Sequence, residues 1–221
     1  MRKFRRKQLK QDKFVESMVA VPHFFSRHAK LLIFIGLVAV GVIAVMTSIG
    51  AYRRSMDSKA SSLFQKAGGA DAFLELYHNY PRSTVAPIAL YEAAAMLFAG
   101  GSYGESKENF RLFLEGFPGH PLAPDALNSV GYCLEAEGQV LQAAGAYRNV
   151  AKEYPDAAAA PGALINSARC YRLAGKDGEA VAQYEMVIRD FPGSLRRVDA
   201  ERYLAELESA PEKVDSDKAG G

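Results

Sequence analysis

The sequence has few of the residues that most often carry chemistry in enzymes and metalloproteins. Only two cysteines and four histidines occur among its 221 residues. No histidine has a second metal ligand at metal-site spacing, so we expect surface or helix-cap roles for His23, His28, His78 and His120. No glycine-rich phosphate loop, nucleophile elbow or metal motif is present. The sequence therefore predicts no catalytic residue, no metal and no cofactor. An enzyme with a site that no motif reveals is the alternative.

Charge is absent from one long stretch. Residues 31–50 read LLIFIGLVAVGVIAVMTSIG, with no charged residue and only Thr47 and Ser48 polar. A helix of this length spans roughly 30 Å, the thickness of the hydrocarbon core of a bilayer. A core helix of a soluble protein would carry a polar stripe, and this one has none. We predict a single transmembrane helix over 31–52. A cleavable signal peptide is the alternative, but its apolar segment would run for only about 7–15 residues.

The charges on either side of this stretch are unequal. Residues 1–30 hold nine Lys and Arg against Asp12 and Glu16, a net +7, so the rest of the chain carries about −5. A short basic tail favours retention in the cytoplasm, although the bias disappears when only charges close to the span are counted. We expect a cytoplasmic N-terminus and an extracytoplasmic body. The basic tail would also be drawn to anionic lipid, whereas nucleic-acid binding is not expected without an aromatic platform.

The rest of the chain repeats itself with a period of 37 residues. A fixed period of this size is typical of stacked structural units. Prolines, glycines, small residues and aromatic residues each recur at this interval. The recurring sets are Pro81, Pro118, Pro155 and Pro192; Pro87, Pro124 and Pro161; Ala89, Ala126, Ala163 and Ala200; Gly101, Gly138 and Gly175; Ser106, Ala143 and Ala180; and Phe110, Tyr147 and Tyr184.

Each unit reads as two antiparallel helices, A and B. Apolar residues recur at helical spacing on both sides of Gly138, which permits the tight turn between the helices. Pro155 ends one helix B because proline lacks the backbone donor that a continuing helix needs. Pro161 falls in the first turn of the next helix A, where that donor has no partner. The fold class predicted is all-α: one N-terminal transmembrane helix followed by a solenoid of helix hairpins, stacked because no hairpin buries its apolar faces alone.

These recurring sets, called columns below, resemble those of the tetratricopeptide repeat, although the usual period of that family is about 34 residues. In the second unit the resemblance is carried by Leu127, Gly131, Leu134, Gly138, Ala143, Tyr147, Val150 and Pro155, and the other two units match at the same positions. The resemblance implies a protein or peptide partner held in a concave groove lined by the A helices. The groove residues it implies are Tyr91, Phe98, Asn128, Tyr132, Glu135, Arg169 and Arg172. An aromatic end and a two-arginine end would suit a peptide with an acidic stretch; a solvated surface is the alternative.

The expected organisation follows from these patterns. It consists of a basic tail at 1–30, the span at 31–52, the solenoid at 53–208 and a disordered tail at 209–221. Within the solenoid we expect a degenerate unit at 55–80, with a helix at 61–67 followed by one at 70–80. Repeats follow at 81–117, 118–154 and 155–191, with a charged capping helix at 195–208.

The whole arrangement resembles bacterial membrane-anchored repeat proteins of the ancillary SecYEG translocon subunit family (YfgM-like). Its repeats also resemble BamD- and CpoB-type proteins, but a lipoprotein anchor needs a cysteine directly after the apolar run, and none is there. The resemblance implies a scaffold in the bacterial inner membrane, with its repeats in the periplasm, acting in protein translocation or envelope assembly. The alternatives are a cytoplasmic-facing adaptor that uses the basic tail, and a periplasmic cell-division or outer-membrane assembly factor.

Two smaller expectations concern cysteines and acidic pairs. Cys133 and Cys170 are 37 residues apart and so occupy equivalent positions on neighbouring A helices. Packed helices lie about 8–10 Å apart, too far for a disulfide, so we predict two buried thiols; a disulfide between repeats is the alternative. The pair Glu135 and Glu137 is spaced two apart on a helix and reads as a solvated face.

Overall fold

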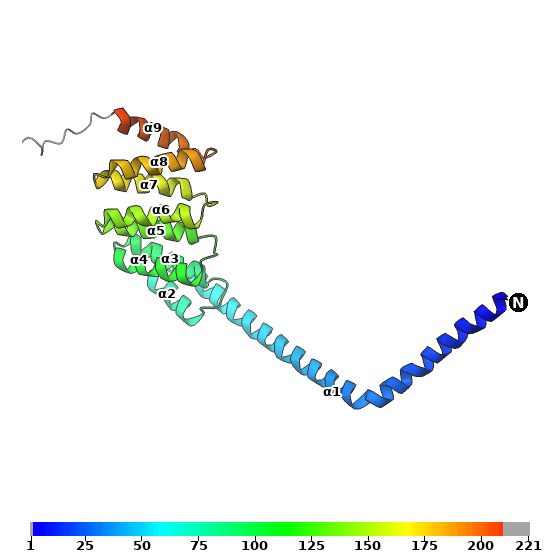
Figure 1. Cartoon of the computed structure of the whole chain (residues 1–221). Helices are drawn as coiled ribbons and strands as arrows, with labels where there is room; N and C mark the ends of the chain where they lie inside the picture. The colour runs from blue at the N-terminus through cyan, green and yellow to red at the C-terminus, as the bar shows by residue number, and fades with distance from the viewer. Residues whose placement is uncertain (1, 210–221) are drawn as a thin grey trace, which may run out of the picture. The chain divides into compact units, whose positions relative to one another are not determined.

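The computed structural model describes the backbone of residues 2–209 and the side chains of residues 29–31 and 33–209. Within this part every regular element is a helix (Figure 1). The helices are α1 (Arg2–Lys66), α2 (Ala70–Asn79), α3 (Ala86–Ala99), α4 (Tyr103–Gly116), α5 (Ala123–Ala136), α6 (Val140–Glu153), α7 (Ala160–Leu173), α8 (Asp177–Asp190) and α9 (Arg196–Ser209). The all-α prediction is therefore confirmed. The predicted disordered tail lies, from residue 210 on, outside the described residues.

Helix α1 belongs to two separate compact units, Met1–Met56 and the unit that begins at Asp57. It continues past residue 52, where the sequence predicted the end of the span, and it includes the helix expected at 61–67. Leu31 and the large apolar side chains between Ile33 and Ile49 are 48% to 67% exposed. This segment is long and apolar enough to cross a membrane. It has no neighbour among the described residues to cover it, unlike the apolar helices of the solenoid.

The three hairpins α3–α4, α5–α6 and α7–α8 are called here the first, second and third repeats, and α3, α5 and α7 are their A helices. In Figure 1 they stack in chain order, each hairpin beside the next. Each A helix has a proline in its first turn, and Pro155 directly follows the C-terminal cap of α6, as predicted. The three turn glycines Gly101, Gly138 and Gly175 have φ of 82°, 77° and 71°. Side chains with a Cβ rarely adopt such values, which explains the glycine column.

The core lies where the A and B helices of each repeat face one another. The aromatic column at Phe110, Tyr147 and Tyr184 is at most 2% exposed. The small-residue column, Ser106, Ala143 and Ala180, is fully buried and allows the two helices to approach closely. In the first repeat the Oγ of Ser106 donates a buried hydrogen bond of 2.7 Å to the carbonyl oxygen of Ala94 on the facing helix. Because a buried hydroxyl needs a partner, this bond holds α3 and α4 at a fixed separation.

The solenoid begins with an irregular hairpin formed by the end of α1 and by α2. Phe73 and Leu76 of α2 are buried and pack with Ala89 and Ala93 of α3. The ring of Phe64, near the end of α1, lies 5.1 Å from that of Phe73 between centroids. Earlier in the helix, the carboxylate of Asp57 accepts a 3.0 Å hydrogen bond from the backbone of Thr84. The last turns of α1 therefore occupy the position of a helix A in this first, irregular hairpin.

Helix α9 closes the other end of the stack. Ala200 is buried, and Tyr203, Leu204 and Leu207 are partly buried in the same apolar cluster as Tyr184. The positions that would face a further helix B are polar instead: Glu201 and Glu208 are both exposed. A polar outer face is typical of the terminal unit of a solenoid.

Candidate functional site

The candidate groove residues fall into separate environments on the A helices. Tyr91 is half-buried in the first repeat, where its ring contacts those of Phe110 and Phe113 edge-on, with centroids 5.4 and 5.9 Å away. Phe98 is partly buried and packs 5.2 Å from the ring of Tyr103. Burial, together with the negative charge of Asp125, raises the pKa of the Tyr91 hydroxyl, so it stays neutral. Both residues therefore serve packing within the first repeat.

A charged network joins the second repeat to the third. Glu135 of α5 accepts two hydrogen bonds from the guanidinium of Arg169 of α7, at 2.8 and 2.6 Å. The hydroxyl of Tyr147 of α6 donates a third, at 2.7 Å. We call these three residues the Glu135 network. A bidentate arginine pair fixes both the distance and the orientation of the two helices.

The network shifts the protonation of its members. Burial by itself would raise the pKa of the Glu135 carboxyl, but the hydrogen bonds from Arg169 and Tyr147 outweigh burial and leave the pKa below its ordinary value. The hydrogen bond to Glu135 raises the pKa of Arg169. Burial and Glu135 both raise the pKa of Tyr147. At neutral pH the network is therefore an ionised pair with a neutral phenol.

One expectation from the sequence is wrong at this place. Glu135 and Glu137 are not a solvated pair, since Glu135 belongs to the network and Glu137 forms an ion pair with Lys107 of α4. The resemblance also implied Arg169 as a groove residue suited to an acidic stretch. Its guanidinium already pairs with Glu135, and its role in binding stays a prediction. Of the two arginines, Arg172 is exposed and lies beside the hydroxyl of Tyr184. The basis for an acidic ligand is therefore much reduced.

Asn128 and Tyr132 line one cavity of about 360 Å³, which we call the α5–α7 cavity. Its polar lining consists of Asp125, Asn128 and Tyr132 from α5, Asn166 from α7 and Arg196 from the start of α9. Ile165 and small residues from the start of α7 form the apolar part. These side chains come from three successive A-type helices, so the cavity exists only in the stacked solenoid.

Tyr132 is the exposed aromatic residue of this cavity. It is 41% exposed, and its ring packs edge-on against Tyr147 with centroids 5.5 Å apart. Its hydroxyl accepts a 3.3 Å hydrogen bond from the side-chain amide of Asn166. Exposed tyrosine held by its neighbours is well suited to binding, because little side-chain entropy is lost on contact.

Asn128 contributes an unused acceptor. Its Oδ1 is buried and has no hydrogen-bond partner among the described residues. A buried amide oxygen without a donor is costly, so rotation of this amide toward a donor in the cavity would be favoured. The sequence predicted Asn128 and Tyr132 as groove residues, and the structure brings them together. Whether they bind a partner stays a prediction.

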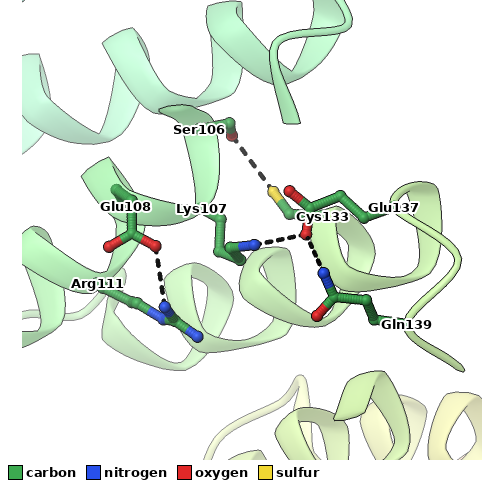
Figure 2. Close-up of polar contacts among 7 residues, drawn as sticks. All are labelled: Ser106, Lys107, Glu108, Arg111, Cys133, Glu137 and Gln139. Carbon is green, nitrogen blue, oxygen red and sulfur yellow. Dashed lines mark hydrogen bonds and ion pairs between the residues drawn. The ribbon is translucent and has the colours of Figure 1, made fainter. Parts of the chain in front are cut away.

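The first and second repeats are joined by other residues than those of the Glu135 network, as Figure 2 shows. Lys107 of α4 reaches across to Glu137 at the end of α5, and Glu137 also accepts a 3.0 Å hydrogen bond from the side-chain amide of Gln139. The thiol of Cys133 lies 3.4 Å from the Oγ of Ser106, toward which it donates. This cluster is partly to fully buried and connects α4 with α5 and the turn that follows, so it stabilises the stack.

The cysteines and one histidine agree with the sequence predictions. Cys133 and Cys170 are both free and buried. Burial raises the pKa of both thiols, and that of Cys170, which also faces the charge of Glu135, reaches about 12. Neither thiol is ionised at neutral pH, so neither is a nucleophile. The Nδ1 of His120 accepts a 3.2 Å hydrogen bond from the backbone of Leu122 and so stabilises the turn before α5.

Sequence reasoning missed Asn166, Arg196 and Lys107. Asn166 and Lys107 fall outside the repeated columns, and Arg196 reaches the cavity only because α9 packs against α7. The one available signal was position: Asn166 directly follows Ile165, which stands 37 residues after Asn128. In the part of the chain whose side chains the structure describes, no three metal-ligating residues cluster together.

Comparison with known proteins identifies the repeats. The model of the tetratricopeptide repeat family matches residues 126–157 and 163–194, which run from α5 into α6 and from α7 into α8. The repeats are tetratricopeptide-like. One similar solved structure is a tetratricopeptide repeat protein from Parabacteroides merdae, with a TM-score of 0.52 and 13% identity over 71% of this chain. The chain covers 60% of that protein. No curated protein matches the sequence.

These comparisons support the fold and a general role. Tetratricopeptide repeats usually serve as protein-binding scaffolds rather than as catalysts, and the A helices of this chain carry the cavity described above. The family match covers the second and third repeats, which also contribute most residues of the cavity.

Proposed function

We propose that this protein is a membrane-anchored scaffold that binds a polypeptide segment of a partner on the A-helix side of its second and third repeats. The observation that carries the proposal is the α5–α7 cavity, with exposed Tyr132 at its wall and the unpaired acceptor of Asn128 beside it. Shape, an aromatic anchor and unsatisfied polar groups together are typical of binding sites.

The anchor is the second part of the proposal. The apolar segment of α1 supports a single span, and the charge of +7 in residues 1–30 supports a cytoplasmic N-terminus with extracytoplasmic repeats. An anchor that holds the repeats near a membrane raises their local concentration toward partners in or near it. Protein translocation and envelope assembly across a bacterial inner membrane are processes that need such a scaffold. Relatedness to the ancillary SecYEG translocon subunits, or to BamD- and CpoB-type proteins, is part of this proposal.

Site-specific photo-crosslinking in cells tests the binding role. A photoreactive amino acid replaces Tyr132, and in a matched control it replaces Arg148, which is exposed on helix α6. We expect position 132 to crosslink a discrete partner, identified by mass spectrometry, that position 148 does not reach. Equal crosslinking from both positions, or none from 132, would contradict the proposal.

A cytoplasmic-facing adaptor that uses its basic tail is the second candidate. It is favoured by the four positive residues Arg53, Arg54, Lys59 and Lys66 on the far side of the apolar segment, which weaken the charge asymmetry near the span. Single cysteines placed near residues 10 and 215, in a background without Cys133 and Cys170, separate the two. An impermeant thiol reagent labels only the C-terminal site if the repeats lie outside the cytoplasm.

A further inference from the structure

The α5 side of the α5–α7 cavity carries a negative charge without an ion-pair partner among the described residues. The carboxylate of Asp125 forms no ion pair among the described residues and lies on the cavity wall. Arg196, which also lines the cavity, lies 3.3 Å from the carboxylate of Asp199, and Arg202 shares that carboxylate at 3.3 Å. Glu135 nearby is compensated by Arg169. On the α5 side of the cavity, where Asp125 lies with Asn128 and Tyr132, the unpaired charge is therefore negative.

The hydrogen-bonding groups on the α5 side of the cavity also favour a positively charged ligand. The Oδ1 of Asn128 is an acceptor without a donor among the described residues. Rotation of the Asn128 amide toward the cavity would present its oxygen beside the Asp125 carboxylate, because the two residues lie three apart on one helix face. A ligand that brings N–H donors and a positive charge would satisfy both.

The remaining walls suit an unbranched stem. Ile165 and the small residues of α7 line the cavity on its apolar side, and the ring of Tyr132 offers a face to a cation. A cavity of about 360 Å³ lies at the small end of ligand sites, enough for one long side chain but not for a helix or a sheet edge.

We infer that the α5–α7 cavity receives a basic side chain, lysine or arginine, from the polypeptide bound on the A-helix side. Its charged end meets Asp125 and Asn128, and its stem lies along Ile165 and Tyr132. This inference rests on the proposed function and names the partner class: a segment with an exposed basic residue, where the two arginines of the sequence had suggested an acidic one.

The test is an NMR titration of the full chain in lipid nanodiscs. The side-chain amide signal of Asn128, assigned by its loss in Asn128→Ala, is followed against that of Gln142, which lies exposed on α6. The probes are Nα-acetyl-lysine amide, the norleucine analogue, which keeps most of the stem without the charge, and the glutamate analogue. We expect saturation by the lysine probe with about three- to fivefold tighter binding than by norleucine, as for a partly exposed ion pair.

Two variants sharpen the result. Asp125→Asn should abolish the preference for lysine over norleucine, and Arg196→Gln should increase it, because the competing positive charge is removed. Tighter binding of the norleucine or glutamate probe, equal binding of all three, or no saturable shift at Asn128 would overturn the inference.

Failure of this inference can be told apart from failure of the proposed function. A partner that still crosslinks at position 132 with equal yield in Asp125→Asn leaves the scaffold role intact and overturns the basic side chain. Absence of any partner at position 132 overturns the scaffold role, whatever the titration shows.

Discussion

The first and second repeats fill equivalent positions with different chemistry. Phe98 and Phe110 of the first correspond, 37 residues on, to Glu135 and Tyr147 of the second. In the first repeat these positions are apolar and pack with aromatic neighbours. In the second, Tyr147 donates a hydrogen bond to Glu135, and Arg169 of the next repeat donates to the same carboxylate. The same backbone frame therefore supports either a self-contained apolar contact or a polar contact that reaches across to the neighbouring hairpin.

A second difference accompanies the first. Ala94 faces the aromatic column in the first repeat, whereas the second has Gly131 at that position. A Cβ at 131 would lie 2.4 Å from the ring of Tyr147, far inside contact distance. The absence of this one carbon lets the ring lie against α5, in the position from which its hydroxyl reaches Glu135. Close approach, rather than backbone conformation, explains this glycine.

Among substitutions that test this difference between the repeats, Gly131→Ala should lower the free energy of unfolding most. The added methyl group clashes with a ring that is fully buried, and overpacking of this kind costs ~1–3 kcal/mol, toward the upper end here. Denaturant unfolding of the full chain in detergent, followed by circular dichroism, measures the change. Gly145→Ala, within helix α6, is the control, since a Cβ added there would have no atom within 4 Å. It should be neutral or stabilising. Equal effects of the two substitutions would contradict the close-approach explanation.

Tyr147→Phe should have the next largest effect, because it gives the second repeat the residue of the first while leaving Glu135 without one donor. A hydrogen bond to a charged group contributes ~1.5–3 kcal/mol, and the partial exposure of this one places the loss near the lower end. The control is Tyr154→Phe, which removes a longer, 3.2 Å hydrogen bond to the carbonyl of Pro118 near the surface. That loss should be smaller. The same unfolding experiment measures both, and a larger loss from the control would count against the network.

The smallest effect is a dependence on pH. Because the pKa of Glu135 is lower in the folded state than in the unfolded chain, the network stabilises the fold above the unfolded pKa of about 4.3. That contribution is lost as the pH falls through the folded pKa. The stability difference between the natural chain and Glu135→Gln should therefore shrink between about pH 6 and pH 3. A difference that stays constant or grows on acidification would show that Glu135 is not held ionised by Arg169.

The sequence was sufficient for what depends on local rules. Pro155 and Pro161 predict where α6 ends and α7 begins, because proline acts on its own turn of helix. Gly138 predicts the turn, because its positive φ is a local requirement. The end of the apolar run predicted the end of the span at residue 52 but not the end of α1, which continues to Lys66 because no proline lies between these positions.

The candidate site could be predicted only in part. Asn128 and Tyr132 were found because they occupy repeated positions on an A helix. The Glu135–Arg169 pair joins residues 34 positions apart. The preceding unit has Phe98 and Tyr132 at the equivalent positions, so the pair does not recur at the repeat interval and the sequence pattern could not predict it. Arg196 reaches the cavity from the capping helix, a contact set by packing of α9 on α7. Pairing across helices depends on three-dimensional arrangement, which periodicity does not specify.

The central claim is that binding takes place on the A helices and not on the B helices. The most direct test is quantitative co-purification of the crosslinked partner with full-length Tyr132→Ala and with Leu141→Ala, which alters a residue of similar exposure on α6. Both variants are first checked for unchanged helicity. The account predicts about a tenfold loss of partner for Tyr132→Ala, as for a binding hot spot, and no loss for Leu141→Ala. Retention by Tyr132→Ala together with loss in Leu141→Ala would contradict it.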